Sequence, residues 1–214
     1  MHFLVTAGAT REPLDAVRFL SNVSTGSTGA ALADALVVRG HTVTLLRGEG
    51  ATQPHLVPEV DVFSSAADLD TLLRERLALG AIDAVVMTAA VSDYRPEQTR
   101  EDKITSDAES LTVRLVRNPK ILPQLKSYAP RPLAVIGFKL TVGADHAARR
   151  AAVAAQLAGG TVDATVQNDL LEIRRAPQHP FWLYRSAEGL PEPISGTVAL
   201  AGALDALAAE LLAR

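Results

Sequence analysis

The sequence has 214 residues, of which 48% are apolar and 21% charged, as expected for a folded globular protein with one α/β domain. Its net charge of −3 and its lack of a dense basic tract argue against a nucleic-acid or anionic-membrane partner. It has no cysteine, which excludes disulfides, thiolate nucleophiles and thiolate metal sites. Because no apolar run approaches the length of a membrane span and residues 1–6 do not resemble a signal peptide, we expect a cytoplasmic location.

Short apolar strands alternate with helices through the first half of the chain. Phe3–Val5 has the composition of a buried parallel strand, and Ala30–Arg39 has the apolar spacing of a helix. Ser65 is expected to cap a later helix, with Asp68 in its first turn. The elements predicted between these are strands at Thr42–Arg47 and Val60–Phe63, followed by a helix from Ser65 to about Leu79 and a strand at Ala84–Thr88.

The connection Thr6–Gly29 is the most informative stretch. It joins a strand to a helix with about twenty residues, whereas α/β loops usually have roughly two to six. Its last residues, 24–29, supply hydroxyl groups and two glycines at the start of the helix. Unpaired amide groups and the helix dipole favour a phosphate or carboxylate at such a position. We therefore expect the active site here.

A second polar insertion, Ala89–Glu109, follows the strand Ala84–Thr88, and its length and charge predict a flap or binding loop. After it, polar and apolar residues alternate over Thr112–Val116, as in a strand with one solvent-exposed face. Asn118 and Pro119 then predict a helix that starts with a cap and a proline and runs to about Ser127.

The remainder continues the alternation. Predicted elements are a strand at Leu133–Phe138, a helix at Asp145 to about Ala158, a strand at Ala164–Val166 ending in Gln167–Asp169, an edge strand at Phe181–Arg185 and a helix at Val198–Leu212. The pattern predicts a Rossmann-like three-layer α/β fold with a mostly parallel sheet, long ligand-binding loops and a flap, in one domain over residues 1–214. Ligands of such sheets bind at the carboxyl ends of the strands.

Other kinds of site fit less well. A dinucleotide-binding enzyme would carry G-x-G-x-x-G after the first strand and an acid after the second, and neither is present, although Arg47 could meet a 2′-phosphate and keeps an NADPH-dependent reductase open. The five histidines lack metal-ligand spacing, so we interpret them as surface or loop residues and expect no metal ligands in the protein. No Ser/His/Asp arrangement or nucleophile elbow is evident.

A series of short motifs, in order, carries a resemblance. TAGATREPLDAVRFLSN-x-STG-x-x-G, AAVSDYRP, DKI, NPKIL, GFKL and QND resemble the phosphopantothenate–cysteine ligase (CoaB) family of coenzyme A biosynthesis, in its free-standing form without a decarboxylase domain. The resemblance implies a ligase that joins 4′-phosphopantothenate and cysteine through an acyl-nucleotide intermediate. It implies CTP, in preference to ATP, as co-substrate, and Mg²⁺ as the metal ion that the reaction needs. It also implies a homodimer formed through strands that project from the main sheet.

The resemblance also implies roles for individual residues. Asn22 and Lys103 match catalytic positions, with Asn22 at the acyl intermediate and Lys103 at the triphosphate. Arg18, Gly26, Thr28 and Gly29 match substrate-binding positions, and Asp93 matches the acid that reads the base. The nucleotide-binding set is Met87, Thr88, Ala89, Asp93, Lys103, Pro119, Lys120, Ile121, Leu122 and Phe138.

Several family lysines are absent from this chain. Thr105 and Ser106 follow Lys103 where the family has further lysines, and Ser27, Gln156 and Gly160 stand at other lysine positions. Lys139, Arg149 or Arg150 could compensate for this loss of positive charge. If none does, the alternative is a non-catalytic nucleotide- or pantothenate-binding paralogue, because fewer cations stabilise a triphosphate less well.

Overall fold

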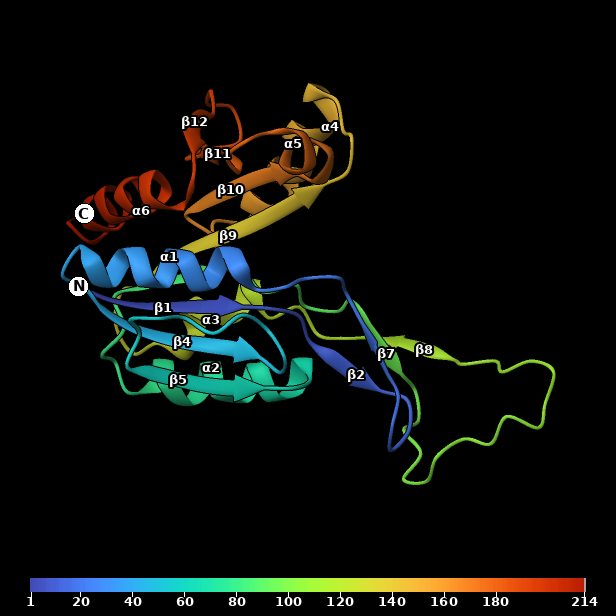
Figure 1. The fold of residues 1–214 in the computed structure, drawn as a ribbon. Helices are drawn as coiled ribbons and strands as arrows, with labels where there is room; N and C mark the ends of the chain where they lie inside the picture. Colours follow the sequence, from blue (N-terminus) through green and yellow to red (C-terminus); the bar gives the residue numbers. More distant parts are fainter. Residues whose placement is uncertain (214) are drawn as a thin grey trace.

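The computed structural model describes residues 1–213 and has one central sheet between two helical layers (Figure 1). The strand order is β12-β11-β10-β9-β6-β1-β4-β5. The strands are β1 (His2–Ala7), β4 (Thr42–Gly48), β5 (Glu59–Phe63), β6 (Ala84–Met87), β9 (Ala134–Thr141), β10 (Ala164–Asp169), β11 (Pro180–Tyr184) and β12 (Glu192–Ser195). All neighbours pair in parallel except β10–β11 and β11–β12. The predicted fold class is confirmed.

Each face of the sheet carries its own core. Phe3 and Val5 of β1 contribute to the core shared by α1 (Ser27–Val38) and α6 (Thr197–Leu212), whereas Leu4 contributes to the opposite core. That second core is covered by α2 (Ala66–Ala78), the short 3₁₀ helix η1 (Leu122–Gln124) and α3 (Leu125–Tyr128). Alternate side chains of a central strand thus fill two apolar layers, which explains the nearly continuous apolar runs of the parallel strands.

Two further helices flank the last strands. The helix α4 (His146–Leu157) packs on β9 and β10, and α5 (Leu170–Arg175) follows β10 directly. The predicted cap of α2 is confirmed: Ser65 accepts a hydrogen bond from the Asp68 amide, and the Asp68 carboxylate accepts one from the Ser65 amide. This reciprocal arrangement fixes where α2 begins.

Two small hairpins project from the sheet, and we call them the arm (residues 11–21 and 94–117). One pairs β2 (Arg11–Pro13) with β3 (Phe19–Ser21), and the other pairs β7 (Tyr94–Pro96) with β8 (Leu115–Arg117). Figure 1 shows them beyond the carboxyl ends of the parallel strands, with the long loop between β7 and β8 farthest out. The connection Thr6–Gly29 therefore contains the hairpin of β2 and β3, and the insertion Ala89–Glu109 contains the expected flap.

Three predicted elements differ from the structure. The bounds predicted for the strand Thr112–Val116 are wrong. The observed strand, β8, is Leu115–Arg117, because it pairs only with the three residues of β7. The helix predicted from Asn118 begins instead at Leu122, since the Asn118 amide donates to the Ser92 carbonyl and does not cap a helix. The strand at Phe181–Arg185 exists as β11, but it is not an edge, because β12 covers it.

Within residues 1–213, no helix is both long and apolar enough to cross a membrane.

Candidate active site

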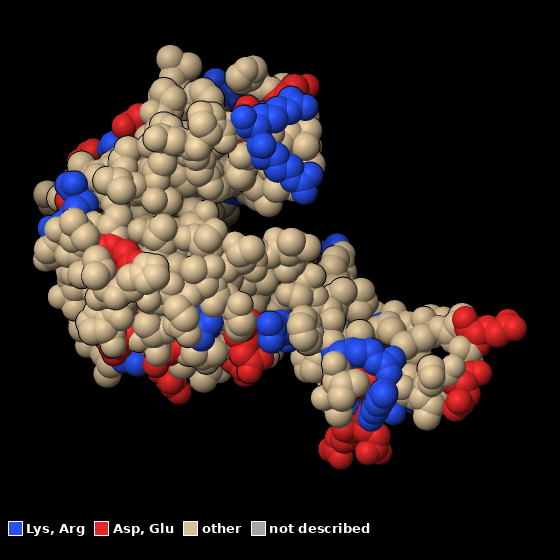
Figure 2. Space-filling view, in the orientation of Figure 1, with Lys and Arg blue, Asp and Glu red and all other residues tan. Residues whose placement is uncertain are grey.

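The predicted site lies where the loops after β1, β6 and β10 meet. Figure 2 shows a deep hollow on this side of the molecule, between the part that carries α4 and α5 and the part that carries α1 and the arm. In that view most of the visible surface of the hollow belongs to uncharged residues. The carboxyl ends of parallel strands open into this region, as expected for an α/β ligand site.

Two glycines let the start of α1 lie close to the neighbouring strands. Gly26 has a left-handed backbone (φ 76°) and caps the helix without a side-chain hydrogen bond. A Cβ on Gly29 would lie 2.5 Å from Thr88 Oγ1 and 2.9 Å from the Thr6 carbonyl oxygen, so only glycine lets the helix lie this close to β1 and β6. The first turn contains no acidic residue. Its amide groups can therefore receive an anionic ligand, as predicted from the sequence.

The end of β6 is held by Thr6. Its hydroxyl oxygen accepts from the Ala89 amide at 3.0 Å and lies 3.7 Å from Met87 Sδ, while Thr88 Oγ1 donates to the Thr6 carbonyl. The Met87 side chain is buried in the α2-side core, so its main chain is the part that can line a base pocket. Thr88 and Ala89 lie partly exposed beside the start of α1.

The loop after β6 brings three predicted residues together. Asn22 Nδ2 donates to the Val91 carbonyl at 3.3 Å, two residues before Asp93. Asp93 forms an ion pair with Lys120, in which both side chains remain more than half exposed (64% and 71%). A pair this exposed contributes only about 0–1 kcal/mol, so either partner can turn to a ligand at little cost.

Arg18 and the flap are tied together through Asp15. The Asp15 carboxylate accepts from the Ile104 amide at 3.0 Å and lies 3.3 Å from Arg18 Nε, and Arg18 Nη2 donates to the Ile104 carbonyl at 2.6 Å. The backbone hydrogen bonds from Ile104 and Val17 hold the pKa of Asp15 below its usual value. Lys103 precedes Ile104 and is exposed. Two residues with separate predicted roles, Arg18 and Lys103, are thus adjacent.

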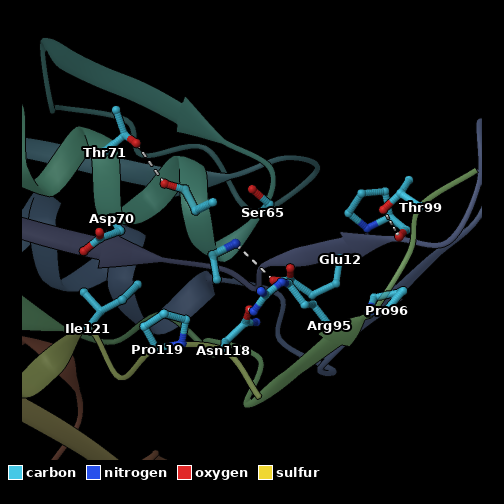
Figure 3. Close-up of a pocket in the computed structure, with 13 residues that line it drawn as sticks. Glu12, Ser65, Asp70, Thr71, Arg95, Pro96, Thr99, Asn118, Pro119 and Ile121 are labelled. Atoms are coloured by element: carbon cyan, nitrogen blue, oxygen red, sulfur yellow. Dashed lines mark hydrogen bonds between the residues drawn. The ribbon is translucent and has the colours of Figure 1, made fainter. Parts of the chain in front are cut away.

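The remaining predicted nucleotide residues divide between two surfaces. Phe138 is partly buried on the α1 side of the sheet, where its ring meets Phe181 edge to face at 6.3 Å. Pro119 and Ile121 line a cavity of about 490 Å³ beside the start of α2 (Figure 3). Ile121 is buried and Leu122 partly buried in the α2-side core.

The cavity has a charged wall as well as an apolar one. Glu12, which is 3% exposed, accepts from the Ala66 amide at 3.0 Å and so joins the arm to α2. Arg95 Nη1 donates to Asn118 Oδ1 at 3.1 Å, and Figure 3 shows both residues at the cavity with Glu12. Glu12 and Arg95 lie within the quoted motifs TAGATREPLDAV and AAVSDYRP, but neither was assigned a role from the sequence.

The cations expected to compensate for the missing lysines are partly committed elsewhere. Arg149 Nη1 donates to Glu172 Oε1 at 2.6 Å, its side chain is only 11% exposed, and Arg150 donates to the Glu188 carbonyl. Arg47, which was considered only as a 2′-phosphate contact of a reductase, is buried and donates to the carbonyls of Gly48 and Ala51. Lys139 is partly exposed at the end of β9.

His179 lies in a loop, in line with the interpretation of the histidines as surface or loop residues, but its ring makes defined contacts. This residue is partly buried just before β11, with its ring stacked on Phe181 at a centroid distance of 4.1 Å. Its Nδ1 lies 3.5 Å from Thr28 Oγ1, and its Nε2 lies 2.9 Å from Asn168 Nδ2. Because alternate residues of an extended chain share a face, the spacing to the apolar Phe181 was the signal available in the sequence.

Among residues 1–213, no group of three or more histidines and carboxylates could hold a metal ion.

Comparison with known proteins decides the family. The model of the DNA/pantothenate metabolism flavoprotein C-terminal domain matches residues 1–178. The chain belongs to this family. It is 34% identical to the coenzyme A biosynthesis bifunctional protein CoaBC of Thermococcus kodakarensis over 78% of the chain, and it spans only 41% of that relative.

Solved structures of family members have the same architecture. The DNA/pantothenate metabolism flavoprotein from Streptococcus pneumoniae superposes with a TM-score of 0.85 at 25% identity, covering 97% of each chain. The C-terminal domain of a CoaBC protein superposes with a TM-score of 0.76 at 26% identity, covering 100% of this chain and 96% of that domain. The mostly parallel sheet with its helices is thus the fold of this family.

Proposed function

We propose that this chain is a phosphopantothenate–cysteine ligase. The observation that carries the proposal is that two separate motifs meet after β1 and β6, where the Asn22 amide of the first contacts the Val91 carbonyl, two residues before Asp93 of the second. Family membership and the name of the CoaBC relative support an activity in coenzyme A biosynthesis. The NADPH-dependent reductase is not favoured, because the Arg47 guanidinium is bonded to main-chain carbonyls.

The reaction divides into two balanced steps. The substrate carboxylate attacks the α-phosphorus of the nucleotide, forming an acyl-phosphate bond and releasing pyrophosphate. The cysteine amine then attacks the acyl carbon, loses a proton and releases the nucleoside monophosphate. Both steps require positioned reactants and a neutralised phosphoryl charge.

The residues divide these tasks between them. The Thr28 and Gly29 amide groups at the start of α1 and the Thr28 hydroxyl bind an anionic group, and the Asn22 amide contacts the acyl oxygen as charge develops on it. Asp93, once released by Lys120, accepts from the exocyclic amine of the base, and Lys120 and Lys103 are then available to the phosphates. Mg²⁺ would serve as the counter-ion of the nucleotide phosphates.

The test is pyrophosphate release. With phosphopantothenate, cysteine and CTP, we expect sustained release, with slower turnover when ATP replaces CTP. Omission of phosphopantothenate should abolish it, whereas omission of cysteine should leave a single burst as the acyl-nucleotide accumulates. No release with either nucleotide would exclude the ligase.

A non-catalytic paralogue is the second candidate. It is favoured by the absent lysines and by the commitment of Arg149 to Glu172. This candidate predicts that calorimetry detects binding of CTP or phosphopantothenate while pyrophosphate release stays at background. Turnover by the purified chain would exclude it.

A further inference from the structure

His179 joins two elements that are distant in sequence, α1 and β10. Through Thr28 it contacts the first turn of α1, and through Asn168 it contacts the end of β10. Its ring lies nearly parallel to that of Phe181, at an interplanar angle of 10°. Because the stack fixes the ring plane, the two nitrogens are held toward their two partners.

The contacts determine where the ring proton lies. The nitrogen of the Asn168 side-chain amide can only donate, so Nε2 of the neutral ring accepts from it at 2.9 Å. The remaining ring proton is then on Nδ1, which donates to Thr28 Oγ1 at 3.5 Å. Burial lowers the pKa of His179, which favours this neutral form at neutral pH.

The direction of these bonds has a consequence for Thr28. Its hydroxyl oxygen accepts from the imidazole, so its own proton is free to be donated. The three groups form one chain of donors, running from Asn168 through His179 to Thr28, and the chain ends at the uncapped first turn of α1. An anionic oxygen bound there would receive the hydroxyl proton as well as helix amides.

We propose that His179 is a positioning residue, which orients the Thr28 hydroxyl to donate to the phosphate of the pantothenate substrate at the start of α1. This proposal rests on the proposed function, because it takes phosphopantothenate as the ligand. His179 does not contact the reacting atoms. It acts through Thr28, whose hydroxyl oxygen it contacts.

A pair of substitutions separates the two nitrogens. The side-chain amide of Asn can place a donor near the position of the imidazole Nδ1, whereas Gln places its terminal group near the position of Nε2. His179→Asn should therefore retain the contact with Thr28, and His179→Gln should retain only that with Asn168. Both substitutions remove the stacking on Phe181, so each controls for the structural effect of the other.

The readout is affinity for phosphopantothenate, measured by calorimetry without nucleotide. We expect about a tenfold weaker Kd for His179→Gln and for Thr28→Val, and a Kd within about threefold of the parent for His179→Asn. The double variant His179→Gln/Thr28→Val should bind no more weakly than Thr28→Val alone, since both changes remove the same interaction. Binding of CTP should not change in any of them.

Each contrary result is decisive. Equal loss of affinity in the Asn and Gln variants, or multiplied effects in the double variant, would overturn the positioning role. Binding of phosphopantothenate by the parent without pyrophosphate release would exclude the ligase and leave the role of His179 intact. Failure of the parent to bind phosphopantothenate would overturn the His179 proposal directly.

Discussion

Lys103 is the flap lysine that remains where the family has several, and it is exposed next to the Ile104 contacts with Asp15 and Arg18. If its charge meets the triphosphate as the transition state forms, Lys103→Met should lower kcat by about two to three orders of magnitude, or roughly 3–4 kcal/mol. The melting temperature should barely change, because the exposed side chain buries little surface. Steady-state kinetics and thermal unfolding measure the two effects.

The neighbouring Asp102 supplies the matched control for this substitution. Asp102→Asn also changes one charge at an exposed flap position and should leave kcat unchanged. Parent-like turnover by Lys103→Met would mean that Arg100 or Lys139 neutralises the phosphates instead, and the catalytic assignment would move to them.

Asn22 is expected to act on the acyl group and not on the nucleotide. In the structure its amide makes one weak contact, to the Val91 carbonyl at 3.3 Å. Asn22→Ala should therefore leave the Kd for CTP within about twofold, while slowing pyrophosphate release by about two orders of magnitude. Calorimetry and single-turnover kinetics separate these effects, and a large loss of CTP affinity would place Asn22 in the nucleotide site.

At the scale of elements, the loop after β9 and the start of α5 depend on one carboxylate. Asp169 is buried and accepts from Thr141 Oγ1 and from the amides of Gly143, Ala144 and Leu171. Burial alone would raise the pKa of Asp169, but these hydrogen bonds outweigh it and lower the pKa strongly. The ionised side chain thus stabilises the folded state.

This carboxylate predicts a dependence of stability on pH. A folded-state pKa below the unfolded value of 3.8 means that its contribution is complete above that pH and is lost as the pH falls below it. Asp169→Asn should reduce the free energy of unfolding at pH 7 and should weaken the acid dependence. Urea unfolding at pH 7 and pH 3 tests this, with the exposed Asp107→Asn as control. An equal loss at both values would contradict it.

The elements show what the sequence could and could not predict. Ala30–Arg39 and the Ser65 cap follow from local rules, and the structure confirms both elements, although α1 begins three residues earlier, at Ser27. Asn118 carries an equally good local signal for a helix start. Its side-chain amide instead donates a hydrogen bond to the Ser92 carbonyl, which lies 26 residues earlier in the chain. Local propensity gives way where a distant backbone group needs the same side chain.

The candidate site divides in the same way. The loops at Thr6–Gly29 and Ala89–Glu109 were found from their length and motifs, because long polar connections are unusual in compact domains. The roles predicted for their individual residues remain predictions. The role of His179 was missed because the two-residue spacing to Phe181 indicates only a shared face, and the contacts with Thr28 and Asn168 arise only when three elements meet.

At the scale of the whole molecule, the arm exposes several large apolar side chains. Val17, Phe19, Tyr94, Leu111 and Leu115 are between 42% and 60% exposed. Exposed apolar groups on projecting strands are typical of a surface that packs on a partner. We therefore expect a homodimer that associates through the arm, in line with the sequence-based expectation.

Light scattering at micromolar concentration tests this association. The parent should have the mass of two chains, and Leu115→Glu should have the mass of one, because a buried unpaired charge strongly disfavours an interface. Val198→Glu is the control, since Val198 is 76% exposed at the start of α6, remote from the arm in Figure 1. A parent with the mass of one chain would contradict the prediction.

The packing of α6 on α1 constrains how the chain folds as it is synthesised. Leu32 and Leu36 of α1 share a core with Leu200 and Leu204 of α6, although about 160 residues separate the two helices in sequence. A nascent chain leaves the ribosome amino terminus first, so the apolar side of α1 remains uncovered until α6 has been synthesised. Until then, β1, β4 and β6 can pair and bury their α2 side, but the α1 side stays open to water and to chaperones.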